Sequence, residues 1–182
     1  MMATRFGQET LMDRYSLVAR LLHWIMAILI LFNLWLGFAH DALPREWQVM
    51  PVHKSVGLTV LALAILRLGW RLTHRPTPLP RELPAWERAA AKAAHYSFYA
   101  FMLFMPLTGW IMTSAGNRPL TWFFLFDIPK FAVSKGDPVV AFSAEAHEIV
   151  GFLWAALILL HVAAALRHHF ILKDGVLRRM LG

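Results

Sequence analysis

Four long apolar runs constrain most strongly what this chain can fold into. They cover about residues 17–38, 52–72, 93–113 and 146–170. A bilayer core is spanned by a helix of about 20 apolar residues, so each run is long enough to cross it. The connection at residues 73–88 is rich in Pro and Arg and cannot continue a helix. The sequence therefore predicts an all-α integral membrane four-helix bundle, with residues 1–182 forming one transmembrane domain.

Composition supports a membrane protein and removes several other classes. Hydrophobic residues make up 58% of the chain, and the mean hydropathy is +0.51. A net charge of +7 would suggest a nucleic-acid partner in a soluble protein, but here the basic residues lie in short segments between apolar runs. We expect a lipid bilayer as partner and no nucleic acid. The chain has no Cys, which excludes disulfides, thiolate-bound clusters and covalently attached Cys-x-x-Cys-His haem.

The distribution of Lys and Arg predicts the orientation. Of the 18 basic residues, all but a few lie on one side of the predicted membrane. Those on the opposite side are Arg45, Lys54, Arg118, Lys130 and Lys135. The richer side is expected to be cytoplasmic. Both termini are therefore predicted to be cytoplasmic, with the first and third connections outside.

Histidines interrupt the apolar runs at matching depths. His147 and His161 are 14 residues apart in the last run. Over 14 helical residues the rotation is ~1400°, about 40° short of four turns, and the rise is ~21 Å, so both lie near one face. His23 in the first run has the depth of His161, and His53 in the second has the depth of His147. Two pairs of imidazoles at two depths suit the axial ligation of two haems.

Two arginines are candidates for the propionates of an inner haem. Arg67 follows His53 by 14 residues, so it shares that face at the inner level. A buried Arg in a membrane helix is costly and needs a partner. Arg20, one turn before His23, is a second candidate. The alternative for Arg67 is that it only extends its charge to the cytoplasmic interface.

Other interpretations of the histidines remain open at this point. They can be polar contacts between helices, or a proton relay in a haem-free transporter. His95 opens the third run on the inner side and competes as an inner ligand. His40 ends the first run, and His74 lies in the Pro-rich connection; we expect both to be solvated.

Several motifs carry a resemblance to a known family. They are LLHW, PVHKSVG, LRLGWRLTHRPTP, GNRP, AHEIVG and LLHVAAALRHHFILKDGVLRRM. Along nearly its whole length the chain resembles the bacterial dihaem cytochrome b561 family. Within it, the chain is most similar to small four-helix members that act as superoxide oxidases, passing electrons from superoxide to ubiquinone.

The resemblance implies a set of cofactors and ligands. It implies two haem b groups in a multi-pass protein of the bacterial inner membrane. His23 and His161 would ligate the cytoplasmic-side haem iron, and His53 and His147 the periplasmic-side one. His95 matches a family histidine that is not an assigned ligand.

The implied substrates suggest two further sites. Superoxide is a small anion, and Lys54, Lys130, Lys135 and Arg118 on the outer side can attract it, although for each of them taken singly an ordinary solvated charge is the favoured interpretation. The chain can alternatively be the cytochrome of a larger redox complex that takes electrons from a protein partner or from another one-electron donor.

The quinone would be reduced at the inner side. His168 follows His161 by seven residues, ~20° off the same face and ~10 Å further along the helix, and can hydrogen-bond a quinone or relay a proton. His169, Arg167 and Trp24 are possible neighbours. The alternative is that these residues only anchor the helix end at the interface.

Overall fold

The protein is a bundle of four long helices in a computed structural model that describes residues 14–74 and 83–181. The long helices are α2 (Leu17–Ala39), α3 (Val49–Thr73), α4 (Ala85–Ser114) and α5 (Pro138–Leu166). The shorter elements are η1 (Arg45–Trp47), β1 (Thr121–Trp122), β2 (Phe126–Asp127), η2 (Arg167–Leu172) and α6 (Arg178–Leu181). Three basic residues used to predict the orientation, Arg5, Arg75 and Arg81, lie outside the described residues.

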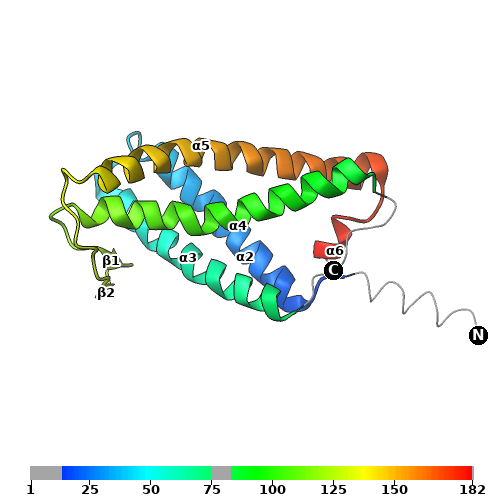
Figure 1. Cartoon of the computed structure of the whole chain (residues 1–182), viewed down its shortest axis with the longest axis horizontal. Coiled ribbons are helices and arrows are strands. Elements are labelled where there is room, and N and C mark those ends of the chain that lie inside the picture. Colours follow the sequence, from blue (N-terminus) through cyan, green and yellow to red (C-terminus); the bar gives the residue numbers. More distant parts are fainter. Residues whose placement is uncertain (1–13, 75–82, 182) are drawn as a thin grey trace, which may run out of the picture.

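Consecutive helices run in opposite directions and pack against one another, α2 on α3, α3 on α4 and α4 on α5 (Figure 1). Both ends of the described chain lie at one end of the bundle, where the backbone N–H of Tyr15 donates to the carbonyl of Arg179 at 3.2 Å. We call this the terminal end. The opposite end carries β1 and β2 and is called the hairpin end. Which end faces the cytoplasm stays a prediction.

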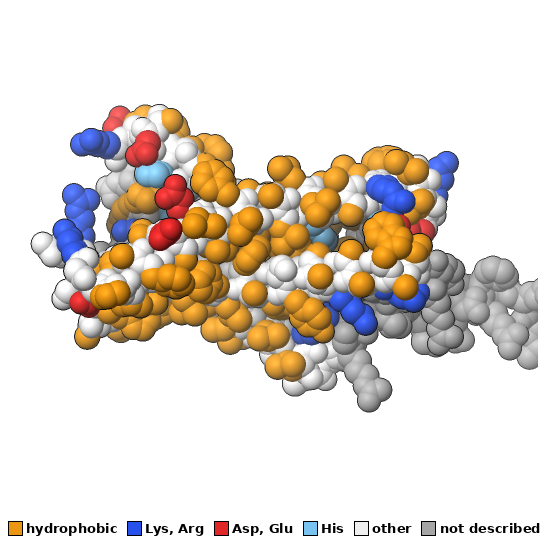
Figure 2. Space-filling view, turned by 45° about the horizontal axis from the view of Figure 1, so that its top comes forward, with side chains coloured by type: hydrophobic (Ala, Val, Ile, Leu, Met, Phe, Trp, Pro, Cys, Tyr) orange, Lys and Arg blue, Asp and Glu red, His pale blue; other side chains and the backbone are white. Residues whose placement is uncertain are grey.

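Three of the long helical segments are long and apolar enough to cross a membrane within the described ranges. They are Leu17–Ala39, Arg45–Thr73 and Pro138–Leu172. Apolar side chains line the helices along the visible face, and charged side chains gather toward the two ends (Figure 2). Helix α4 is of similar length but begins with the charged residues Glu87, Arg88 and Lys92. Its crossing of the membrane remains a prediction.

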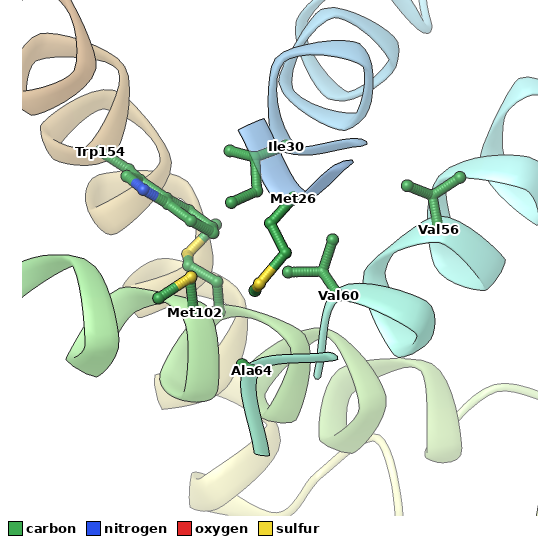
Figure 3. Packing of buried hydrophobic residues seen from close by; sticks show 8 residues of the cluster. Met26, Ile30, Val56, Val60, Ala64, Met102 and Trp154 are labelled. Atoms are coloured by element: carbon green, nitrogen blue, oxygen red, sulfur yellow. The ribbon is translucent and has the colours of Figure 1, made fainter. Parts of the chain in front are cut away.

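The apolar core lies midway along the bundle and takes side chains from all four long helices (Figure 3). It contains Met26, Ile30, Val56, Val60, Ala64, Met102, Met105 and Trp154. Trp154 is 5% exposed and is seven residues from both His147 and His161 in the sequence. The core therefore lies between the levels of the two histidine pairs.

The hairpin is attached to α3 by side-chain hydrogen bonds. Ser55 Oγ accepts from the backbone N–H of Phe123 at 2.8 Å, and its single hydrogen lies between the carbonyls of Pro51 at 2.9 Å and Thr121 at 3.3 Å. The indole of Trp122 donates to the hydroxyl of Thr59 at 3.0 Å. These bonds hold the third connection against the bundle beside the first turns of α3.

Candidate functional site

At the hairpin end, the rings of His53 on α3 and His147 on α5 face each other. Their ring centres are 6.1 Å apart, and the ring planes are at 76°. Each ring lies against a glycine of the neighbouring helix. A Cβ atom on Gly37 would stand 3.1 Å from Cε1 of His53, and one on Gly109 would stand 3.1 Å from Cε1 of His147. The absence of a side chain at these two positions lets the imidazoles lie close to α2 and α4.

Hydrogen bonds set which nitrogen of each ring is free. His53 Nδ1 donates to the carbonyl of Asn33 at 3.0 Å. His147 Nδ1 donates to the carbonyl of Met105 at 3.0 Å and lies 3.1 Å from the hydroxyl of Thr108. A carbonyl can only accept, so Nδ1 carries the hydrogen and Nε2 keeps a free lone pair. This is the form in which imidazole binds a metal.

A cavity of about 610 Å³ surrounds this pair. Its lining includes both rings and Lys54 and is mostly apolar, with side chains from all four long helices such as Ile30, Leu34, Pro106 and Phe152. An apolar pocket with a few polar groups is typical of sites that hold a planar organic cofactor.

The second pair lies toward the terminal end. The ring centres of His23 on α2 and His161 on α5 are 6.4 Å apart, with the planes at 73°. Trp24 packs against His23 at 5.1 Å, and Phe98 packs against His161 at 5.2 Å. The structure thus brings His161 to His23. His95 on α4, one turn before Phe98, lies close enough for its charge to act on His23 and on His161.

Beyond this pair, η2 continues α5 as a π-helical turn, and His168 lies in it. Nδ1 of His168 is 2.5 Å from Oδ2 of Asp174, and Nε2 is 3.9 Å from Oε2 of Glu87. Oε1 of Glu87 accepts from Nη1 of Arg167 at 3.1 Å. We call Glu87, Arg167, His168 and Asp174 the terminal-end cluster.

The other predicted quinone neighbours lie around this cluster. The indole of Trp24 donates to the carbonyl of Met180 at 3.1 Å, which ties the last turn of the chain to α2. His169 packs its ring against Phe170 at 4.7 Å.

Comparison with known proteins gives a consistent family. The family model described as prokaryotic cytochrome b561 matches residues 14–182. This chain belongs to the prokaryotic cytochrome b561 family. It is 30% identical to cytochrome b561 homolog 2 of Escherichia coli K12 over 175 residues, covering 93% of this chain and 92% of the relative.

Two further relatives extend the comparison. The chain is 29% identical to cytochrome b561 homolog 1 of Escherichia coli K12 over 180 residues, covering 93% of this chain and 98% of the relative. It is 27% identical to the Yersinia pestis protein named "Probable superoxide oxidase CybB" over 177 residues, covering 92% of this chain and 96% of the relative. As a cytochrome b561, the chain is a bacterial membrane protein that transfers electrons and binds b-type haem.

Both histidine pairs of this cytochrome b561 fit the axial ligation of a haem iron. A metal held at about 2.0 Å by one nitrogen of each of two imidazoles separates the ring centres by about 6 Å, as in both pairs. In the part of the chain that the structure describes, no three His, Cys, Asp or Glu side chains gather into a group that could hold a metal ion. Two facing imidazoles suit an iron whose other ligands are porphyrin nitrogens. The assignment of each ligand stays a proposal.

The two arginines predicted for haem propionates are both half-buried in this cytochrome b561. Nε of Arg67 donates to the hydroxyl of Tyr99 at 3.4 Å, so this side chain reaches across to α4. Arg20 lies one turn before His23 on α2. Their contact with propionates stays a prediction.

Of the predicted outer lysines, the structure brings two together. Lys54 is half-buried and lines the cavity of the hairpin-end pair. The charged groups of Arg118 and Lys130 are close enough to repel the charge of Lys54. Nζ of Lys130 donates to the carbonyls of Gly116 and Arg118. Lys135 is exposed in the connection before α5, and no described contact brings it to this group.

Sequence reasoning missed several positions that the structure places beside the predicted site residues of this cytochrome b561. Gly37 and Gly109 were not singled out, because their importance depends on a neighbouring helix. Glu87 was assigned to a Pro-rich connection, and Asp174 was noted only as part of a motif. The sequence did contain one signal for Glu87 and Asp174: both are acidic residues in segments that are otherwise rich in Lys and Arg.

Proposed function

We propose that this cytochrome b561 oxidises superoxide at the hairpin end and reduces ubiquinone at the terminal end. In the proposed reaction, two superoxide anions each lose one electron to become oxygen, and ubiquinone takes up both electrons and two protons to become ubiquinol. The observation that carries the proposal is the pair of facing imidazoles at each level, His53 with His147 and His23 with His161. When bound, haem supplies the one-electron chemistry that both half-reactions need.

Charge at the hairpin end supports an anionic electron donor. Lys54 lines the same cavity as His53 and His147, as does the carboxylate of Glu148, and the charges of Arg118 and Lys130 are close enough to add to the positive field at Lys54. Positive charge around an apolar-walled opening raises the local concentration of a small anion and its rate of encounter. The Yersinia pestis relative carries the name of a superoxide oxidase, which agrees with this choice of donor.

The terminal end supports a lipid-soluble acceptor that needs protons. Trp24 is 40% exposed on the outside of the bundle and packs against His23. A quinone arriving from the bilayer can therefore contact a side chain that touches the terminal-end pair. The imidazole of His168 lies at the same end, and histidine side chains commonly serve as proton shuttles in proteins.

The test uses the purified protein in liposomes that contain ubiquinone. A reduced-minus-oxidised absorbance spectrum should show b-type haem, superoxide generated outside should reduce it rapidly, and ubiquinol should accumulate. A well-folded protein without a b-type spectrum would contradict haem binding through these pairs. Slow reduction by superoxide, with a redox protein co-purifying in equal amount in mild detergent, would identify the chain as the cytochrome of a larger complex instead.

A further inference from the structure

Within the terminal-end cluster, the side chains of Glu87, His168 and Asp174 are largely covered by protein, whereas that of Arg167 is 46% exposed. The side chains of Glu87 and His168 are 9% and 14% exposed, and that of Asp174 is 23% exposed. Two carboxylates from different parts of the chain thus approach the two nitrogens of one imidazole. Burying charged groups is costly unless they are paired, so this arrangement is not a feature of packing alone.

The backbone after η2 is shaped to bring Asp174 onto His168. Lys173 and Gly175 both have positive φ, 56° and 79°, which turns the chain back toward the helix. The backbone N–H of Asp174 donates to the carbonyl of His168 at 3.3 Å. Oδ1 of Asp174 accepts from the N–H of Val176 at 3.1 Å, which leaves Oδ2 for the imidazole. The carboxylate is therefore held in position before any ligand arrives.

The position of Asp174 determines which nitrogen of His168 can exchange a proton. A carboxylate accepts a hydrogen bond, so Nδ1 carries the hydrogen and Nε2 is the nitrogen that takes up and releases protons. Nε2 points toward Oε2 of Glu87, which is 3.9 Å away and too distant for a hydrogen bond.

Glu87 gives a second observation, separate from the His168–Asp174 contact, that points to a ligand or proton-transfer site here. Its Oε2 atom is buried and has no hydrogen-bond partner within the described residues, while Arg167 occupies Oε1. A buried carboxylate oxygen without a partner is unfavourable by itself. A ligand hydroxyl or a shared proton between Oε2 and Nε2 of His168 would satisfy it. The π-helical turn that carries Arg167 and His168 is a local geometry that often occurs at functional sites.

We propose that Glu87, His168 and Asp174 deliver protons to the quinone, an inference that rests on the proposed quinone reduction. Oε2 of Glu87, after taking up a proton from water, first passes that proton to the free Nε2 of the neutral His168 ring, which becomes an imidazolium. The N–H bond at Nε2 then breaks as the reduced quinone oxygen takes this proton, and the ring returns to its form with hydrogen on Nδ1 only. Two such transfers supply the two protons of ubiquinol. Asp174 is a positioning residue that holds the ring and its tautomer, and Arg167 holds Glu87.

The test compares His168→Gln, Asp174→Asn and Glu87→Gln in the haem-loaded protein. All three should keep the haem spectrum and the rate at which superoxide reduces it. The rate of ubiquinol formation should fall about 100-fold in His168→Gln, the lower end of the range for loss of a proton-transfer group, and about 10-fold or more in the other two. Changing the solvent from H₂O to D₂O should also slow the steady-state turnover on ubiquinone by a larger factor in the three variants than in the wild type.

Matched controls come from histidine and carboxylate groups outside the cluster. Asp41 pairs with His40 at 3.3 Å near the other end of α2 and is exposed, so Asp41→Asn removes a similar His–Asp contact. His74 stacks on Trp70 at 3.6 Å, so His74→Gln removes an imidazole without touching the cluster. Both controls should form ubiquinol at the wild-type rate. Normal ubiquinol formation in all three cluster variants would overturn the relay and leave the proposed function intact.

A second readout does not depend on turnover. In ¹⁵N NMR of histidine-labelled protein, the resonances lost in His168→Gln identify His168. These should report hydrogen on Nδ1 in the wild type and a changed tautomer in Asp174→Asn. Hydrogen on Nε2 in the neutral wild-type ring would overturn the positioning by Asp174. If the wild type reduces its haem with superoxide but forms no ubiquinol, both the acceptor in the proposed function and the relay are wrong.

Discussion

A Cβ atom on Gly109 of α4 would stand 3.1 Å from Cε1 of His147 on α5. The same relation joins Gly37 of α2 to His53 of α3. Each imidazole of the hairpin-end pair thus lies against bare backbone of the preceding helix in the chain. These two contacts fix how far the rings can swing, and they suggest the first prediction.

Gly109→Val should displace His147 and lower occupancy of the hairpin-end haem. The branched side chain would overlap the ring, which is also held at Nδ1 by the Met105 carbonyl. We expect loss of about half of the b-type absorbance, the share of one of two sites. Gly69→Val is the control, because apart from the nearby backbone of its own helix nothing lies within 4 Å of a Cβ at Gly69. Full haem content in Gly109→Val would show that the close approach is not needed for binding.

Single alanine variants should separate the two haems. His147→Ala and His23→Ala are each expected to remove about half of the reduced-minus-oxidised signal, because a bis-histidine haem loses one axial ligand in each case. The double variant should have no b-type signal. His95→Ala should keep both haems. Loss of the terminal-end haem in His95→Ala, but not in His23→Ala, would reverse the ligand assignment.

Lys54→Gln should slow the reaction with superoxide without changing haem content. Removal of one positive charge beside the hairpin-end cavity should lower the second-order rate about 3-fold or more at low salt and flatten its dependence on ionic strength. Stopped-flow reduction of the haem measures both. Lys92→Gln is the control, since Lys92 is exposed on α4 toward the opposite end. An equal effect in both variants would mean that only net charge matters.

Trp154→Ala should destabilise the bundle strongly. The side chain is 5% exposed in the core between the two histidine levels, so its removal leaves a cavity (Figure 3). Truncation of a buried Trp costs about 3–5 kcal/mol of unfolding free energy. Denaturation in detergent with helicity as the signal would measure it. Leu159→Ala, at a position 73% exposed on the same helix, should change stability far less.

The apolar runs located the helices, but not their ends. The first run, residues 17–38, agrees with α2 to within one residue. Helix α4 begins at Ala85, before the run at 93–113, and α5 begins at Pro138, before the run at 146–170. Hydropathy detects only the part of a helix suited to hydrocarbon, whereas the backbone continues to hydrogen-bond through the polar turns on either side. For that reason Glu87 was expected in a connection and is found in a helix.

Spacing within one helix can be read directly from a sequence, because the helical rise and rotation per residue are constant. The interval from His147 to His161, and the depths of His23 and His53, follow from this geometry. The approach of Gly109 to His147, and of Glu87 to His168, does not. Glu87 and His168 lie on different elements and meet only because α4 packs on α5. Such contacts depend on how helices are placed and rotated against each other, and that is settled by side-chain packing across the whole bundle.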